Sequence, residues 1–506
     1  SDGMLAERAQ LIGFPLLIKA SAGGGGRGMR VVESQQVFRE ALESAKREAR
    51  AAFGDDTVLL ERYLRDPRHI EFQILADTHG TTIHLGEREC SIQRRHQKIV
   101  EEAPSVALTP ALRGEMGAAA VRAAESVRYS NAGTCEFMLD GDGAYYFLEM
   151  NARLQVEHPV TEAVYGVDLV HWQLRIASGE RLTLAQDGVT PRGWAIETRI
   201  YAEDPANAML PSTGTIARWL PPEGPGIRVD AGVTDGSAVS HYYDPMLAKL
   251  IVSGDDRAMA IARLQCALKG FVVDGVRTNL PLLLWIARDE AFARGNTTTG
   301  FLAERLDESI FARDAAPIEA TLLCASALLV DGRAPWRIGD VGMPLRLQHG
   351  DRVIEILADA AGASRWRLSG FASGELKAQR RGESVRAEFD GKPLDGVVTY
   401  DAGAFNVHLD GSSWEFAFAA PPSAEAASGG HGAAAGAHVT APMPGRIVKI
   451  AVRDGDAVDE HALLIVLEAM KMEHRIEAPA AATVKAVLVK EGQIVPGGTP
   501  LVELGS

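Results

Sequence analysis

The chain has 506 residues, of which 46% are hydrophobic and 24% are charged, so its composition is that of a globular protein with about three or four domains. Its formal net charge of −15 argues against a nucleic-acid partner, because no basic excess is present to neutralise phosphates. The four cysteines have no Cys-x-x-Cys spacing and no apolar run reaches the ~18 residues of a membrane span, so we expect no disulfide framework, no zinc site and no membrane partner.

Residues 1 to about 310 alternate strand-like and helix-like segments, as α/β and α+β enzymes do. A short apolar strand at 16–18 precedes a loop with glycines at 23–26 and 28. Glycine has no Cβ, so the backbone N–H groups of such a loop can approach phosphate oxygens, and Lys19 adds a positive charge at its foot. The loop has neither the Gly-Lys-Ser/Thr ending of a Walker A motif nor a spaced dinucleotide fingerprint, so a flexible turn is the alternative interpretation.

Further along, the pattern predicts strands at 58–62 and 70–76 and an alanine-rich helix at 110–127. Residues 134–139 and 145–150 form a hairpin pattern around Asp-Gly-Asp-Gly, which is a strong turn signal. Basic residues gather between positions 88 and 98, and this local cluster in an acidic chain suggests a site for a small anion.

Two carboxylates and an amide converge on the predicted hairpin. Glu149 and Asn151 are two residues apart on one strand and therefore share a face, and Glu136 on the paired strand can point the same way. These hard oxygen ligands suit Mg²⁺, or Mn²⁺, bridging nucleotide phosphates. A solvated strand face is the alternative, but the surrounding residues 147–151 are otherwise apolar, so we expect the segment to be half-buried and its charges to need a partner.

Several segments of this region, taken as a set, resemble the ATP-grasp biotin carboxylase over residues 1 to about 310. They are the glycine loop, Glu61-Arg-Tyr-Leu64, Pro67-Arg-His69, Gln93-Arg-Arg-His-Gln-Lys98 and Glu149-Met-Asn-Ala-Arg-Leu-Gln-Val-Glu-His-Pro159.

The resemblance implies which residues bind the nucleotide and its metal. The glycine loop would hold the phosphates, the segment Glu61–Leu64 would line the adenine, and polar residues of the later segments would contact the ribose. The residues are Lys19, Gly24, Gly25 and Gly26 for the phosphates, Glu61, Arg62 and Leu64 for the adenine, His69, Gln93 and His96 for the ribose, and Glu136, Glu149 and Asn151 for the metal.

The resemblance also implies a catalytic set for bicarbonate. Bicarbonate is a poor nucleophile until it is deprotonated, so a carboxylate base beside a guanidinium is what the formation of carboxyphosphate needs. A planar guanidinium can also grip planar bicarbonate with two hydrogen bonds. The implied residues are Arg153, Gln155 and Val156 for bicarbonate, Glu157 as the base, Arg228 for the enolate of biotin, and Lys98 as a family active-site lysine.

The chain departs from this family in one large respect. The family carries an amino-terminal α/β domain before the glycine loop that is not in this chain, so we expect the sequence to be a fragment or the native polypeptide to be longer. The alternative is a non-catalytic biotin carrier and scaffold with an incomplete ATP-grasp module. A smaller departure is Ala152 in place of the usual threonine between Asn151 and Arg153.

The middle of the chain, residues 318–419, begins with one apolar helix at 318–330 and continues as short alternating strands punctuated by glycine. The pattern predicts a small antiparallel barrel or sandwich. The segment is far too short for the carboxyltransferase barrel of pyruvate carboxylase. By length and order it resembles the domain that docks an alpha subunit of acyl-CoA carboxylases onto the beta subunit. The predicted strands are 352–357, 365–368, 385–389, 405–409 and 414–418.

Residues 420–437 are almost only Ala, Pro, Ser and Gly and form a flexible linker that cannot bury a core. An internal repeat follows: a shift of 37 residues superposes Ala441-Pro442 on Ala478-Pro479 and the segment from 445 on the segment from 482. Two copies of one β-unit predict a small two-fold barrel, with Lys471 in the link between the copies.

A lysine between two methionines at a hairpin tip resembles the biotinyl-lysine of a biotin carboxyl carrier domain. The related lipoyl domain usually has Asp-Lys-Ala at this turn, and an ordinary exposed lysine is the remaining alternative. Carbamoyl-phosphate synthetase shares the ATP-grasp fold and the bicarbonate chemistry but lacks such a domain.

Together these resemblances imply a multidomain α+β alpha subunit of a biotin-dependent acyl-CoA carboxylase. With ATP and bicarbonate it would carboxylate biotin on Lys471 and supply carboxybiotin to a carboxyltransferase beta subunit acting on 3-methylcrotonyl-CoA or propionyl/acetyl-CoA. We expect an assembly of six alpha and six beta subunits, biotin attachment by a biotin protein ligase, and a cytoplasmic location, or the mitochondrial matrix in a eukaryote. The expected domains are ATP-grasp 1–200, biotin carboxylase C-terminal 201–312, docking 318–419, linker 420–437 and carrier 438–505.

Overall fold

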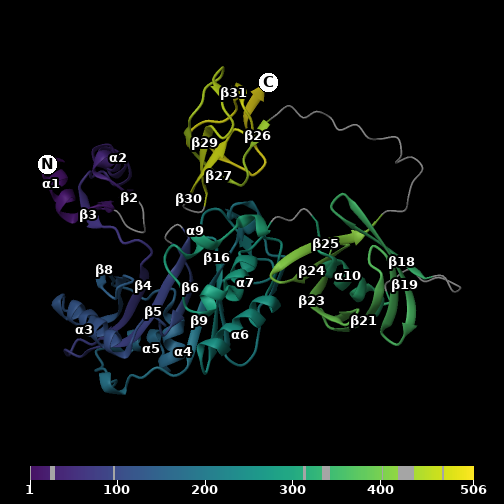
Figure 1. The fold of residues 1–506 in the computed structure, drawn as a ribbon, viewed down its shortest axis with the longest axis horizontal. Coiled ribbons are helices and arrows are strands. Elements are labelled where there is room, and N and C mark those ends of the chain that lie inside the picture. Colours follow the sequence, from purple (N-terminus) through teal and green to yellow (C-terminus); the bar gives the residue numbers. More distant parts are fainter. Residues whose placement is uncertain are drawn as a thin grey trace. The chain divides into compact units, whose positions relative to one another are not determined.

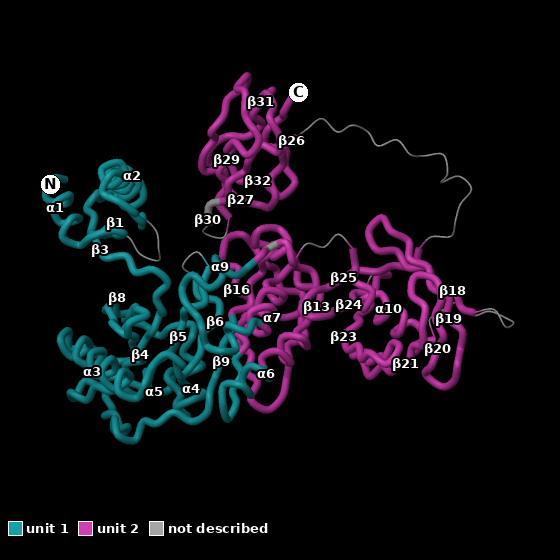
Figure 2. The backbone as a smooth tube through the Cα atoms, in the orientation of Figure 1, with its two compact units in different colours: residues 1–198, 251–263, 289–306 teal, residues 199–250, 264–288, 307–506 magenta. Residues whose placement is uncertain are grey.

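A computed structural model gives the fold and divides the chain into two compact units, residues 1–198, 251–263 and 289–306 in the first and residues 199–250, 264–288 and 307–506 in the second (Figure 2). No helix of the described part is long and apolar enough to cross a membrane. The described residues are 2–22, 29–94, 97–311, 315–332, 342–401, 403–419, 438–469 and 472–505. The predicted roles of Gly24, Gly25, Gly26, His96 and Lys471, and the predicted linker at 420–437, lie outside them.

The first unit begins with a small α/β lobe whose three antiparallel strands have the order β2-β1-β3. Apolar residues of α2 such as Phe38 and Leu42 pack onto Leu16 and Ile18 of the sheet. Helix α2 ends at Gly54, whose φ of 75° is the left-handed conformation that glycine adopts without strain. The elements are α1 (Asp2–Ile12), β1 (Leu16–Ala20), β2 (Met29–Val32), α2 (Gln35–Phe53) and β3 (Val58–Arg62) (Figure 1).

The centre of the first unit is an antiparallel run of strands in the order β9-β6-β5-β4-β7-β8. Strand β4 alternates apolar and polar residues: Ile70, Phe72 and Ile74 face α3, which begins at the capping Thr109. The elements are β4 (Arg68–Ala76), β5 (Thr82–Arg94), β6 (Gln97–Ala103), α3 (Pro110–Ser126), β7 (Asn131–Leu139), β8 (Tyr145–Asn151), α4 (His158–Tyr165), α5 (Leu169–Ala177), η1 (Gln186–Gly188), β9 (Trp194–Tyr201), α8 (Glu290–Ala293) and α9 (Phe301–Arg305).

The second unit opens with short strands and helices. Strand β14 lies beside β16, and β13 pairs with β17, whereas β16 and α6 run across the boundary between the units. The elements are β10 (Glu203–Asp204), η2 (Pro205–Asn207), β11 (Leu210–Pro211), β12 (Gly214–Thr215), β13 (Arg218–Leu220), β14 (Ile227–Ala231), β15 (Ala238–Val239), β16 (Met246–Gly254), α6 (Arg257–Gly270), β17 (Val272–Asp274), α7 (Leu280–Arg288) and η3 (Glu308–Phe311).

The predicted barrel of the middle segment is confirmed. Helix α10 (Ile318–Val330) is buried from Ala320 to Leu329, and its apolar side chains share one core with alternate residues of a closed eight-stranded antiparallel barrel (Figure 1). The strands alternate buried and exposed residues, the pattern of a barrel filled by side chains. They are β18 (Met343–His349), β19 (Arg352–Gly362), β20 (Arg365–Gly370), β21 (Gly374–Arg381), β22 (Ser384–Phe389), β23 (Lys392–Asp401), β24 (Ala404–Leu409) and β25 (Ser412–Phe418).

The carboxy-terminal region consists of two four-stranded sheets, β26-β33-β31-β28 and β30-β29-β27-β32. The predicted repeat is visible in these strands, because a shift of 37 residues carries β27 onto β31 and β28 onto β32. Strands β29 and β30 pair as an antiparallel hairpin up to Ala469 and Met472. The strands are β26 (His438–Thr440), β27 (Gly445–Ile450), β28 (Ala457–Val458), β29 (Leu463–Ala469), β30 (Met472–Glu477), β31 (Ala482–Val487), β32 (Ile494–Val495) and β33 (Pro500–Gly505).

Candidate active site

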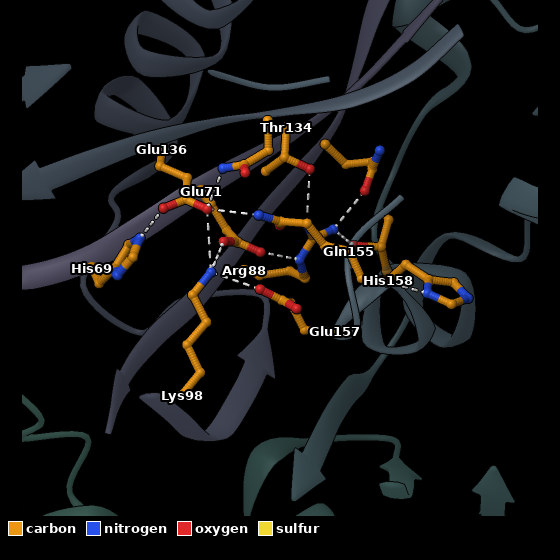
Figure 3. A network of polar contacts seen from close by, with 12 residues as sticks. His69, Glu71, Arg88, Lys98, Thr134, Glu136, Gln155, Glu157 and His158 are labelled. Atoms are coloured by element: carbon orange, nitrogen blue, oxygen red, sulfur yellow. Dashed lines mark hydrogen bonds and ion pairs between the residues drawn. The ribbon is translucent and has the colours of Figure 1, made fainter. Parts of the chain in front are cut away.

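The candidate site starts from the polar face of β4, the face opposite α3. His69, Glu71 and Gln73 alternate with the apolar residues of this strand and are buried nevertheless. Residues of α4 and of the segment before it, such as Thr161 and Gln155, contact the polar side chains of this face. The strand register places Arg88 of β5 and Glu136 of β7 directly opposite Glu71. A row of charged residues therefore runs across neighbouring strands in the interior of the first unit (Figure 3).

Glu136 is buried, and four side chains around it, including that of Lys98, make hydrogen bonds or ion-pair contacts with its carboxylate. His69 Nε2 lies 2.9 Å from Glu136 Oε2, and Gln155 Nε2 and Asn151 Nδ2 donate to Oε1 at 2.6 and 2.8 Å. Burial raises the pKa of Glu136, but the hydrogen bond with His69 and the charge of Lys98 outweigh this effect and lower it to about 2. Glu136 is therefore ionised across the physiological pH range.

Lys98 joins three carboxylates. Its ammonium Nζ lies 2.5 Å from Glu71 Oε2, 2.6 Å from Glu157 Oε1 and 3.4 Å from Glu136 Oε1 (Figure 3). Burial lowers the pKa of Lys98, but the neighbouring carboxylates, Glu71 first among them, raise it well above its ordinary value. The ammonium thus stays charged and fixes the carboxylate of Glu157, which is 3% exposed and stands immediately before α4.

The predicted metal ligands are brought together. Glu149 of β8 lies directly opposite Glu136 of β7, and Asn151 donates to Glu136 at 2.8 Å and to Glu149 at 3.3 Å. The donor set fits Mg²⁺, because one carboxylate is buried and the other faces solvent, where phosphates and water can complete the coordination. Asn151 would have to turn its carbonyl oxygen toward the ion to become a ligand.

The expectation that residues 147–151 are half-buried is wrong for Glu149. Strand β8 is the edge of the sheet, so it has a neighbour on one side only, and both Glu149 and Phe147 are exposed. Phe147 and Glu149 thus lie on an open face at the edge of the sheet, although the residues around Glu149 are apolar.

Some of the residues predicted to bind the nucleotide lie within the described part of the chain. Lys19 of β1 and Glu61 of β3 stand on neighbouring strands with 3.9 Å between Nζ and Oε1. Arg62 donates to the Tyr146 hydroxyl at 3.4 Å. Leu64 and Gln93 are half-buried, and His69 contacts Glu136 as described above. The nucleotide roles of these residues stay predictions.

The segment predicted for bicarbonate precedes α4. Gln155 and Glu157 are buried and belong to the polar network, and Val156 is half-buried. Arg153 is exposed and donates to the backbone oxygen of Leu154 at 3.3 Å. The structure thus brings two of these four residues into contact with the Lys98 and Glu136 cluster.

Arg228 belongs to the second unit, on β14. Its guanidinium donates to both oxygens of Asp230, from Nε at 2.8 Å and from Nη2 at 2.9 Å, and Lys249 lies 3.3 Å from the same carboxylate. Two cations thus share one carboxylate, and a net positive charge remains. The role of Arg228 toward an enolate stays a prediction.

Glu71 and Arg88 were missed by the sequence analysis. A signal was present in the strict alternation of polar and apolar residues from His69 to Ile74, since a strand with both faces buried needs partners for its polar side. The basic cluster between positions 88 and 98 was noticed, but periodicity alone could not pair Arg88 with a particular carboxylate.

Three family models match the chain. They are the carbamoyl-phosphate synthase L chain ATP-binding domain over residues 3–185, the biotin carboxylase C-terminal domain over residues 197–304, and the domain of biotin-requiring enzymes over residues 437–504.

Similar proteins cover nearly the whole chain. The mitochondrial methylcrotonoyl-CoA carboxylase subunit alpha of Rattus norvegicus is 38% identical over 99% of this chain and 74% of its own length. The propionyl-CoA carboxylase alpha chain of Ruegeria pomeroyi is 40% identical over 95% of this chain and 76% of its own length.

Solved structures resemble the first part of the chain. The biotin carboxylase domain of Hydrogenobacter thermophilus 2-oxoglutarate carboxylase, in complex with MgADP, ADP and bicarbonate, is 47% identical with a TM-score of 0.60, and the match covers 63% of this chain and 69% of that one. Campylobacter jejuni biotin carboxylase with a bound ATP analogue is 42% identical with a TM-score of 0.58, covering 59% of this chain and 67% of that one.

Proposed function

Since the chain belongs to the alpha subunits of biotin-dependent acyl-CoA carboxylases, we propose that it charges biotin on Lys471 and passes the carboxyl group to a separate carboxyltransferase beta subunit. The chain is a biotin carboxylase of the ATP-grasp fold, and its cofactors are biotin, ATP and Mg²⁺. Its activity is the ATP-dependent carboxylation of biotin.

The contact of Lys98 with Glu157 carries the proposed chemistry. Glu157 accepts a charge-assisted hydrogen bond from an ammonium, so its carboxylate is ionised and can accept the proton of bicarbonate. The resulting carbonate attacks the γ-phosphorus of ATP, ADP leaves, and carboxyphosphate forms. Carboxyphosphate then divides into phosphate and CO₂. When attached, biotin would supply the nitrogen that takes up this CO₂, and the phosphate released from carboxyphosphate would accept the proton that this nitrogen loses.

The other residues of the site hold the reactants. We assign Gln155, with Arg153 and Val156, to bicarbonate, because Gln155 already belongs to the buried network that orients Glu157. Glu136 and Glu149 would bind Mg²⁺ at the nucleotide phosphates, where the ion neutralises the charge that develops on transfer. Lys98 keeps Glu157 in place and compensates the negative charge of three neighbouring carboxylates.

The acyl-CoA is proposed only as a class, a short or branched acyl-CoA. Relatives named for methylcrotonoyl-CoA and for propionyl-CoA are similarly close to this chain, and the acceptor would be chosen on the beta subunit. The barrel with α10 at residues 318–419 is the proposed docking domain for that subunit, an assignment supported by its position between the carboxylase and carrier regions. Biotin protein ligase and an assembly of six alpha and six beta subunits complete the proposal.

The test is bicarbonate-dependent ATP hydrolysis by the full-length alpha subunit in the presence of free biotin. Glu157→Gln should abolish it, because an amide cannot accept the proton. Glu180→Gln is the matched control: Glu180 is an exposed glutamate paired with Arg175 on the surface, and its loss should leave the rate unchanged. Hydrolysis retained by Glu157→Gln would remove Glu157 as the base, and no hydrolysis by the wild type would favour the carrier-and-scaffold alternative.

A further inference from the structure

Arg88 is the most completely bonded side chain of the buried network. It is 0% exposed, and a guanidinium has five N–H donors in a fixed planar arrangement. All five have an acceptor, and the acceptors come from β4, β7, α4 and the segment before α4, so one side chain joins four parts of the site (Figure 3). Nε donates to Glu71 Oε1 at 2.5 Å, Nη1 to Gln73 Oε1 at 2.7 Å and Thr161 Oγ1 at 2.9 Å, and Nη2 to Gln155 Oε1 at 2.9 Å and Thr134 Oγ1 at 3.2 Å.

These contacts determine which way the amide of Gln155 faces. A guanidinium can only donate, so the atom of Gln155 that meets Arg88 must be the carbonyl oxygen. The other end of the amide lies 2.6 Å from Oε1 of the Glu136 carboxylate, an acceptor, so that end is the NH₂ group. Both neighbours require the same orientation, and reversing the amide would place a donor against a donor and an acceptor against an acceptor.

Arg88 also holds Glu71, the carboxylate that binds Lys98. It holds Oε1 of the Glu71 carboxylate, and the other oxygen, Oε2, receives the Lys98 ammonium at 2.5 Å. Since Lys98 in turn contacts Glu157 Oε1 at 2.6 Å, the position of the proposed base depends on Arg88 through three successive charged contacts. The carboxylates of Glu71 and Glu157 offset the unfavourable burial of Arg88 and raise its pKa.

We propose that Arg88 is a positioning residue for the bicarbonate half of the reaction: it fixes the orientation of the Gln155 amide and, through Glu71 and Lys98, the position of the Glu157 carboxylate. This inference rests on the proposed function of Gln155 and Glu157. Arg88 itself touches no substrate in this assignment. It contacts neither Lys19 of β1 nor Glu61 of β3 and reaches Glu136 only through Gln155 and Lys98, so we expect a smaller effect on ATP than on bicarbonate.

The site requires the planar guanidinium with its donors in several directions, and not the positive charge alone. Lysine would keep the positive charge but offers a compact ammonium that cannot reach Glu71 and Gln155 in two directions at once. Two buried threonines provide a matched pair of subtler variants, because each gives one acceptor to Arg88. Thr134 binds Nη2, the nitrogen that holds Gln155, whereas Thr161 binds Nη1, which has no contact with Gln155.

The experiment measures bicarbonate-dependent ATP hydrolysis by the full-length enzyme with free biotin, varying bicarbonate and ATP separately. Arg88→Lys should lower kcat/KM for bicarbonate by about a hundredfold, as a small misplacement of reacting groups does, while KM for ATP stays within about twofold of the wild type. Thr134→Val should raise KM for bicarbonate by about fivefold, and Thr161→Val by less than about twofold.

A kcat/KM for bicarbonate in Arg88→Lys within about twofold of the wild type, or an equal rise in the KM values for bicarbonate and ATP, would mean that Arg88 serves only the fold. Should Arg88→Lys not be recovered as folded protein, the threonine pair decides: equal effects of Thr134→Val and Thr161→Val on bicarbonate overturn the inference, and a larger effect of Thr134→Val supports it. A wild-type enzyme without bicarbonate dependence would instead refute the proposed function, on which the inference rests.

Discussion

Replacing Glu136 by glutamine tests the electrostatics of the site most sharply. Glutamine keeps the shape of the side chain and resembles the protonated acid, so the variant removes the charge that His69 and Lys98 stabilise. The pKa of Glu136 is lowered from 4.5 to about 2, and each unit of such a shift corresponds to ~1.4 kcal/mol, so the ionised form contributes about 3 kcal/mol at neutral pH. The folded-state pKa is below the unfolded-state one, so this stability is present above pH 4.5 and is lost as the pH falls toward 2.

Hydrogen exchange of the backbone amides of β4 and β7 is the suitable assay, because it reports the local free energy of opening in a multidomain chain. A loss of about 3 kcal/mol predicts about hundredfold faster exchange in these strands at pH 7 in Glu136→Gln, and the same difference at pH 6. Glu149→Gln is the matched control, since Glu149 lies directly opposite on β8 but is exposed, and its exchange should be unchanged. Less than about tenfold faster exchange in Glu136→Gln would refute the reasoning.

Two further predictions concern the metal and the biotin. Glu149→Gln should raise the Mg²⁺ concentration needed for half-maximal ATP hydrolysis by at least about tenfold, because the site loses a carboxylate oxygen ligand; an unchanged Mg²⁺ titration would exclude Glu149 as a ligand. Lys471→Arg should keep ATP hydrolysis with free biotin but abolish covalent biotin, detected by streptavidin blotting, because a guanidinium does not form the amide that lysine forms; biotin retained on this variant would place the attachment elsewhere.

The repeat of the carrier region and the proximity of Glu136, Glu149 and Asn151 were predictable because their signals are local. The 37-residue repeat depends only on matching letters, and it locates β27 and β31 to the residue. Glu136, Glu149 and Asn151 were found because a turn of known type connects their strands and thereby sets the register between them. Short-range turn chemistry is enough to bring such residues together.

The interior of the site was not predictable in the same way. Glu71 meets Arg88 and Glu136 only because β4 lies between β5 and β7, and this order depends on pairings that are distant in sequence. The burial of Glu149 was misjudged for a related reason. Apolar neighbours indicate a strand, but whether that strand is central or at the edge is decided by the order of the whole sheet.

The middle segment was predicted in part: its helix was found, but only some strands of its barrel were. The helix at 318–330 was predicted to the residue, since its uniformly apolar letters match an element buried on all sides. The strands Met343–His349, Gly374–Arg381 and Lys392–Asp401 were not singled out, although they complete the barrel. They contain Pro344, Gly374 and Pro393, residue types that are depleted in strands, so their patterns were weaker signals.

The central claim is that biotin charged by this chain supplies an acyl-CoA carboxylation on a separate beta subunit. The most direct test is the fixation of labelled bicarbonate into a panel of acyl-CoAs by the full-length alpha subunit co-purified with its native partner. The account predicts label in one short or branched acyl-CoA and none with Lys471→Arg. Consumption of ATP without label in any acyl-CoA of the panel would contradict it.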